Sequence, residues 1–251
     1  MNESKYIYAI IETSKPREFT APGIGGMGNR VYTTHSNGLA AVVSTSPIVK
    51  YPVSRENTMA HQKVLEEVMK EFTLLPVRFC TIAEDEEKIK EKVLKARSQE
   101  FKDLLAEMKG KAELGVRAFW TDMNAIFTET IEENPPIKQL KALLLKEKNI
   151  QRQYAGKIKV GQMVQKALEE KKTKQAQELL AALKPLSVDL RERKVYGDQN
   201  IFNTAFLVSR EREREFDQKM QELEKVYGQR TKLKYFGPIP PCNFVEVAVT
   251  W

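Results

Sequence analysis

Apolar positions in the first half of the chain fall first into short runs and then into a helical period. Runs rich in β-branched and aromatic residues predict three strands, over residues 6–11, 30–34 and 39–44. An Asn37-Gly38 pair stands between the last two runs. Such a pair is a strong signal for a tight turn, so we expect residues 30–44 to form a β-hairpin.

A period of three to four residues begins at Arg55. It forms one apolar stripe of an amphipathic helix, made of His61, Val64, Leu65, Val68 and Phe72. Residues 74–82 return to strand character, and Pro76 within them favours an edge strand because proline cannot donate a ladder hydrogen bond. A second long helix is expected over residues 85–109, with an acidic first turn and Gly110 as its stop.

The second half of the chain predicts another unit of mixed structure. Strands are expected over residues 113–120, 187–196, 201–208, 231–236 and 244–249. The first gap between strands holds helical sequence broken at residues 134–136 (Asn-Pro-Pro) and a basic helix from about residue 160 to 184. Another helix is expected over residues 212–227. This order is β-α-β-β-α-β with an inserted helix and an extra terminal strand, which is typical of the split βαβ, ferredoxin-like arrangement.

The predicted fold class is therefore α+β with two domains. An N-terminal mixed α/β domain covers residues 1–110, and a C-terminal modified ferredoxin-like domain covers residues 111–251, with a helical insertion at about 134–157. The length of 251 residues, with 41% hydrophobic and 30% charged residues, lies in the range of ordinary soluble globular proteins. The single apolar run near the N-terminus is too short for a signal core or a membrane span, so we expect a cytoplasmic protein without membrane association.

Candidate catalytic and cofactor motifs have ordinary structural interpretations. Residues 23–28 satisfy the spacing GxGxxG, but no strand leads directly into the glycines and no helix begins within them, so a loop is the preferred interpretation. His61 and Cys80 could form a nucleophile pair, yet each lies on an apolar stripe or strand where a buried side chain is common. We expect no metal, no cofactor and no enzymatic activity.

The charge of the chain is uneven. There are 41 Lys and Arg against 34 Asp and Glu, and residues 134–184 alone hold 12 against 4. Lysines on this segment could follow a phosphate backbone, so a basic nucleic-acid-binding module remains the alternative function. Tyr154 is the only aromatic residue between Phe127 and Tyr196, which leaves little for base stacking. An acidic protein surface or a simply solvated basic helix is the preferred interpretation, and no nucleic acid is expected.

One combination of motifs is more specific. The run Leu-Pro-Val-Arg-Phe-Cys-Thr at residues 75–81 is followed about 160 positions later by Gly-Pro-Ile-Pro-Pro at residues 237–241. With the run Phe-Asn-Thr-Ala-Phe-Leu-Val at 202–208, these residues resemble the gas vesicle protein F/L family over nearly the whole chain. The family usually has Gly where Cys80 stands, Trp where Ile239 stands and Tyr where Cys242 stands.

The resemblance implies an accessory protein of gas vesicle formation. Such a protein would be cytoplasmic, associated with the vesicle and not enzymatic, and its partners would be the small, very hydrophobic shell protein and other accessory proteins. An apolar subunit of that kind aggregates unless its exposed surface is covered, so the partner would act as a chaperone or nucleator.

Three segments are expected to contact the shell protein. The first is the edge strand, where an added strand could dock beside Leu75, Pro76, Arg78 and Phe79. The second is the apolar stretch at 236–241, either a rigid clasp, which we favour, or an exposed ligand, with the contact residues Ile239 and Pro240. The third is the basic helix, which would attract an acidic partner through Lys166, Lys171, Lys172 and Lys174.

Overall fold

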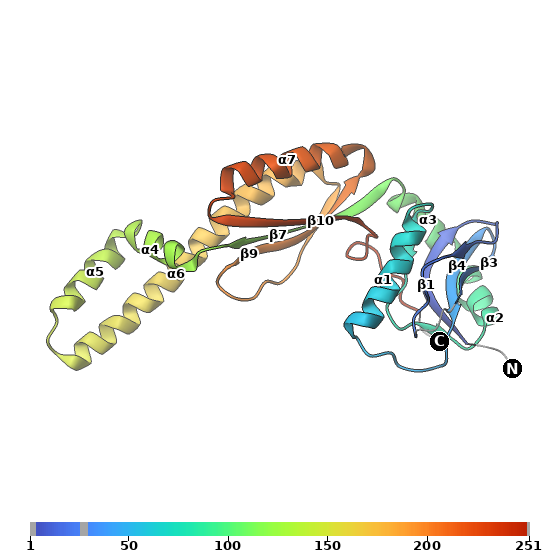
Figure 1. Ribbon diagram of the computed structural model, residues 1–251, viewed down its shortest axis with the longest axis horizontal. Coiled ribbons are helices and arrows are strands. Elements are labelled where there is room, and N and C mark those ends of the chain that lie inside the picture. Colours follow the sequence, from blue (N-terminus) through green and yellow to red (C-terminus); the bar gives the residue numbers. More distant parts are fainter. Residues whose placement is uncertain (1–3, 26–29, 250–251) are drawn as a thin grey trace. The chain divides into compact units, whose positions relative to one another are not determined.

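The computed structural model describes residues 4–25 and 30–249. The chain divides into two compact units (Figure 1). Unit 1 comprises Met1–Leu114, Leu207–Glu211 and Gly237–Trp251, and unit 2 comprises Gly115–Phe206 and Arg212–Phe236. The sequence predicts one boundary between residues 110 and 111, whereas in the structure the chain returns to unit 1 twice. Two sheets together with α-helices confirm the α+β class.

A sheet with β1 near its centre organises unit 1. The strand order is β2-β3-β4-β1-β5, and β6 also pairs with β1. These strands are β1 (Lys5–Glu12), β2 (Glu18–Phe19), β3 (Val31–Ser36), β4 (Leu39–Thr45), β5 (Leu74–Pro76) and β6 (Ile82–Ala83). The predicted hairpin is confirmed, since β3 and β4 pair antiparallel around Asn37 and Gly38, whose φ angles are 53° and 79°.

Helices cover both faces of this sheet. On one face α1 (Arg55–Met69) packs His61, Val64, Leu65 and Val68 toward the sheet, as the stripe predicts. On the other face lie α2 (Glu86–Lys88), the π-helical segment η1 (Ile89–Lys95) and α3 (Ser98–Met108). The predicted continuous helix over 85–109 is thus wrong in detail. The wider π turn buries the adjacent Val93 and Leu94 together, and Ala96 N–H bonds the carbonyl of Glu91 five residues back.

The expected strand over residues 74–82 is also interrupted. Within it the named strands are β5 and the start of β6, Val77 forms a single bridge to Val247, and the chain turns at Cys80, whose φ is +65°. That region of φ favours glycine, which is the residue the gas vesicle F/L family usually has there. The sequence shows an apolar run across this turn because Val77 and Phe79 still pack inward.

The second sheet has the order β10-β7-β9-β8. Its strands are β7 (Lys111–Trp120), β8 (Asp189–Glu192), β9 (Asn200–Ser209) and β10 (Thr231–Ile239). Between β7 and β8 come α4 (Met123–Glu132), α5 (Pro135–Lys146), α6 (Ile150–Leu183) and the 3-10 turn η2 (Lys184–Leu186). Between β9 and β10 come the 3-10 turn η3 (Arg210–Arg212) and α7 (Glu213–Tyr227).

Several boundaries in the second half differ from expectation. The break at residues 134–136 is confirmed, because α5 begins at Pro135, a position that proline favours. In contrast, α6 begins ten residues earlier than predicted, where the side chain of Asn149 caps it. The strand expected over 187–196 is only four residues long, and the one expected over 244–249 is absent from that described segment, which makes a single bridge at Val247.

A long helical hairpin projects from the sheet of unit 2 (Figure 1). Helix α6 has 34 residues and spans about 51 Å. Its C-terminal half buries Leu179 and Leu183, while its N-terminal half packs against α5. The two helices approach closely at Gly156, where a Cβ atom would lie 2.1 Å from Cδ2 of Leu144.

Candidate partner-binding surfaces

The predicted docking edge is occupied by the chain itself. Strand β5 lies at the end of the strand order, which confirms the edge position of Pro76. However, Val247 N–H donates to the carbonyl of Pro76 (2.8 Å), and Arg78 N–H donates to the carbonyl of Val247 (3.0 Å). The place where the sequence suggests that an added strand could dock is therefore occupied, at Pro76 and Arg78, by a C-terminal segment of the same chain.

The side chains at this edge are mostly inside unit 1. Leu75 and Pro76 are buried, and Phe79 is half-buried with its ring 5.7 Å from that of His61. Only Arg78 is exposed, and its guanidinium donates to the carboxylate of Glu246 at 2.9 Å. The four residues thus serve the packing of unit 1 and the attachment of its C-terminal segment.

His61 and Cys80 are joined through Tyr6. The Tyr6 hydroxyl accepts from Cys80 N–H (2.9 Å) and also forms a hydrogen bond with Nδ1 of His61 (3.0 Å). Burial lowers the pKa of His61 to about 4, which keeps the imidazole neutral near pH 7. The Cys80 thiol instead accepts from Tyr51 N–H (3.2 Å). This geometry is that of a satisfied core histidine, as the ordinary interpretation of the sequence expects.

The remaining candidate features are the glycine motif, metal-ligating side chains and membrane-spanning helices. The glycine motif falls partly on residues 26–29, outside the described residues, and Ile24 N–H donates to the Tyr8 hydroxyl (2.7 Å). Within residues 4–25 and 30–249, no group of three or more His, Cys, Asp or Glu side chains could hold a metal ion. In the same part of the chain, no helix has both the length and the apolar character needed to cross a membrane.

The apolar stretch at 236–241 is exposed at its start and buried toward its end. Residues 236–238 are exposed, Ile239 is half-buried and Pro240 is buried. Just beyond them, Asn243 donates from its backbone (2.9 Å) and from its side-chain amide to the carboxyl group of the buried Glu113. These hydrogen bonds anchor the end of the stretch within unit 1.

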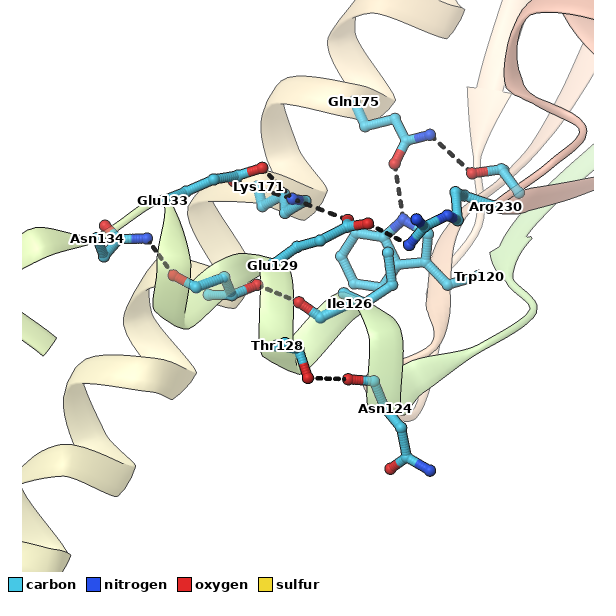
Figure 2. A network of polar contacts seen from close by, with 12 residues as sticks. Trp120, Asn124, Ile126, Thr128, Glu129, Glu133, Asn134, Lys171, Gln175 and Arg230 are labelled. Carbon is cyan, nitrogen blue, oxygen red and sulfur yellow. Dashed lines mark hydrogen bonds and ion pairs between the residues drawn. The ribbon is translucent and has the colours of Figure 1, made fainter. Parts of the chain in front are cut away.

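The basic helix is partly neutralised within unit 2. Lys171 donates to Glu129 of α4 (3.5 Å) and to Glu133 just after it (2.9 Å), and Glu129 also pairs with Arg230 (Figure 2). Lys172 bonds Glu169 (2.8 Å) and Lys166 lies 3.9 Å from Glu170. Lys174 is exposed. Of the four predicted lysines, Lys171 is thus a link between two helices.

A neighbouring network fixes α6 to the sheet. The indole N–H of Trp120 donates to the side-chain oxygen of Gln175 (2.7 Å), whose amide donates to the Thr231 hydroxyl (2.8 Å) (Figure 2). Trp120 is buried, and its indole N–H is the first donor in this series of hydrogen bonds. The C-terminal half of α6 is therefore anchored, and the distal half depends on α5 for its packing.

The turn between α5 and α6 exposes a surface that the sequence analysis does not anticipate. Five large apolar side chains are exposed there, and we call them together the tip patch: Leu143, Leu145, Ile150, Tyr154 and Ile158. The last three share one face of α6, whereas Leu143 and Leu145 flank Leu144, which packs on Gly156. The available signal is an excess of apolar residues in α5, where Ile137, Leu140 and Leu144 already supply the face that turns away from solvent. Further apolar residues on such a short helix cannot all be internal.

Comparisons with known proteins point to one family. The family model described as "Gas vesicle synthesis protein GvpL/GvpF" matches residues 4–246. Gas vesicle protein F of Streptomyces sp. is 30% identical over 247 residues, covering 97% of this chain and all of the relative. Gas vesicle protein L1 of Halobacterium salinarum is 25% identical, with 97% of this chain and 91% of the relative covered.

Solved structures agree over the full length. The crystal structure of the gas vesicle protein GvpF from Anabaena sp. PCC7120 has a TM-score of 0.86 at 25% identity, covering 98% of this chain and 99% of that one. The crystal structure of GvpF from Microcystis aeruginosa has a TM-score of 0.78 at 27% identity, covering 98% and 100%.

Proposed function

The chain belongs to the GvpL/GvpF family of gas vesicle synthesis proteins, and we propose that it is an accessory protein that binds the small hydrophobic shell protein. In this role it keeps the shell protein from aggregating and delivers or nucleates it during vesicle formation. It does so without catalysis, in the cytoplasm, and in association with the growing vesicle and other accessory proteins.

The observation that carries the proposal is the family match over residues 4–246. Two structural features support it. Five large apolar side chains are exposed near the turn between α5 and α6, and an exposed apolar stripe such as that of Ile150, Tyr154 and Ile158 is typical of interaction surfaces. The His61 imidazole is buried and hydrogen-bonded to Tyr6, and burial lowers its pKa to about 4, which supports a structural role for this histidine.

The fold of unit 2 fits this assignment. Its strand order β10-β7-β9-β8, with helices inserted after β7 and after β9, supports a modified ferredoxin-like arrangement. A nucleic-acid partner is less well supported, because Lys166, Lys171 and Lys172 all lie near carboxylates that compete with phosphate for them.

Co-expression tests the proposal. The chain and the shell protein would be produced together, and the soluble fraction would be separated on a sizing column, with an unrelated basic protein of similar mass as control. We expect the shell protein to remain soluble and to co-elute with this chain only. Precipitation of the shell protein while this chain elutes alone would contradict direct binding.

A further inference from the structure

We propose that the tip patch is the surface that binds the shell protein, and that it takes an apolar segment bordered by carboxylates. This inference rests on the proposed function, because it names the surface and the chemistry by which the partner is recognised. It involves residues distinct from the edge, the clasp and the lysines that the sequence suggests.

Exposure and spacing are the first evidence. The side chains of Leu145 and Ile150 are each 82% exposed and Tyr154 is 68% exposed. Ile150, Tyr154 and Ile158 follow one another at intervals of four, so they share one face of α6 over about 12 Å. Tyr154 provides a large, stiff ring of the kind that dominates binding energy at protein interfaces.

The hairpin presents this face in a fixed shape. Close packing of Leu144 on Gly156 holds α5 against α6. At the turn, Asn149 accepts from the N–H groups of Gln151 (3.0 Å) and Arg152 (3.1 Å), and Glu147 accepts from Asn149 N–H (2.9 Å). A surface ordered before binding loses little conformational entropy when a partner arrives.

Charge decides which occupant fits. Six exposed basic residues lie in the same stretch of chain, 141–159, as the exposed apolar side chains, and Glu147 is the one acidic residue of that stretch. The basic residues are Lys141, Lys146, Lys148, Arg152, Lys157 and Lys159. A second copy of this chain would bring like charges together, which opposes self-association. A partner segment with an apolar centre and an acidic border satisfies both features.

An anionic lipid surface has similar chemistry but fits less well. Helices that lie in a membrane interface bury a long, continuous apolar face. Here the inner side chains of α5 pack in the hairpin, since Ile137 is buried and Leu144 contacts Gly156, so only the tip is available. A protein segment that matches a short stripe is the occupant the geometry favours.

The experiment compares two double variants of the full chain in the co-expression assay. Ile150→Asp with Tyr154→Asp places two charges in the tip patch. The matched control, Val188→Asp with Val226→Asp, places the same two charges on exposed apolar side chains elsewhere in unit 2. Circular dichroism and thermal unfolding confirm that both variants fold.

We expect the tip variant to retain about one tenth of the shell protein that wild type retains, or less, while the control retains as much as wild type. Raising the salt concentration should weaken wild-type retention, because the border is charged. Equal retention by the tip variant would overturn the inference and leave the proposed function standing. Equal loss in both variants would also overturn it.

Two further outcomes separate the remaining alternatives. If wild type retains no shell protein at all, the proposed function fails, and the inference falls with it. Vesicles of phosphatidylcholine with phosphatidylglycerol serve as a lipid probe for the same variants. If the tip variant loses vesicle binding but keeps the shell protein, the patch recognises lipid and the inference is wrong.

Discussion

The edge of the first sheet and the tip patch each carry groups that could bind a partner, but the chain covers only the edge. At the edge, Pro76 and Arg78 exchange backbone hydrogen bonds with Val247 of the same chain. At the tip, Ile150 and Tyr154 remain exposed within unit 2. An unpaired edge and an exposed apolar stripe both invite a partner, but only the edge has received one from within the chain.

The difference shows where to look for intermolecular contact in such a protein. A strand edge with apolar residues and unused backbone groups is covered when another segment of the chain is complementary to it. Here Val245 and Val247 pack into the core around Leu75 and cover the edge. The hairpin tip projects beyond the sheet of its own unit, so no other segment of that unit covers it (Figure 1). Binding is expected at the tip rather than at the edge.

The largest predicted effect is a pH dependence of stability that arises in unit 1. Unit 1 buries His61, whereas the hairpin of unit 2 carries no histidine. Burial lowers the pKa of His61 from 6.5 to about 4. Between these values the unfolded chain binds a proton that the folded chain does not, so the free energy of unfolding falls as pH decreases. The loss reaches about 3 kcal/mol near pH 4 and is absent above pH 6.5.

Urea unfolding at pH 7, 5.5 and 4 measures this effect against His61→Gln, which keeps an acceptor for the Tyr6 hydroxyl without titrating. The variant should lose less stability over this range than wild type. Parallel pH dependence of the two proteins would show that His61 is not desolvated as described.

The next effect tests whether the edge is covered and the tip is not. Val247→Ala removes two buried methyl groups from the segment that covers the edge and should cost about 2 kcal/mol in the free energy of unfolding. Leu145→Ala removes exposed atoms and should cost less than about 0.5 kcal/mol. Denaturant unfolding measures both, and an equal cost for Leu145→Ala would mean that the tip is covered in solution.

The smallest effect concerns the lysines of α6. Lys171→Ala breaks a half-buried ion pair with Glu133 and Glu129 and should cost about 1 kcal/mol or less. Lys174→Ala changes an exposed side chain and should leave the melting temperature unchanged. The comparison is sharpened if neither change alters retention of the shell protein, because neither lysine lies within the stretch that surrounds the tip patch.

Local signals in the sequence predict much of the first unit. The Asn37-Gly38 turn and the stripe from His61 to Val68 are confirmed because their causes lie within a few residues of each other. The edge position of Pro76 is confirmed for the same reason. The motifs at 75–81 and 237–241 identify the family through resemblance, which composition alone does not reach.

Features that depend on distant residues are not predictable in this way. The segment near Val247 has strand-like composition but pairs only at one bridge, because it lies along an edge formed 170 residues earlier. From the sequence alone Lys171 is interpreted as a free cation, because only the fold places Glu129 and Glu133 beside it. The exposure of Ile150, Tyr154 and Ile158 is not predictable in the same way, since apolar spacing on a helix does not say whether anything packs against it.

Hydrogen–deuterium exchange of the full chain, alone and with the shell protein, tests the central claim most directly. In the free chain, the amides of Arg78 and Val247 should already be protected, because both donate within unit 1. Adding the shell protein should increase protection across residues 143–158 and leave Arg78 and Val247 unchanged. New protection at the edge, with none at the hairpin tip, would contradict the account.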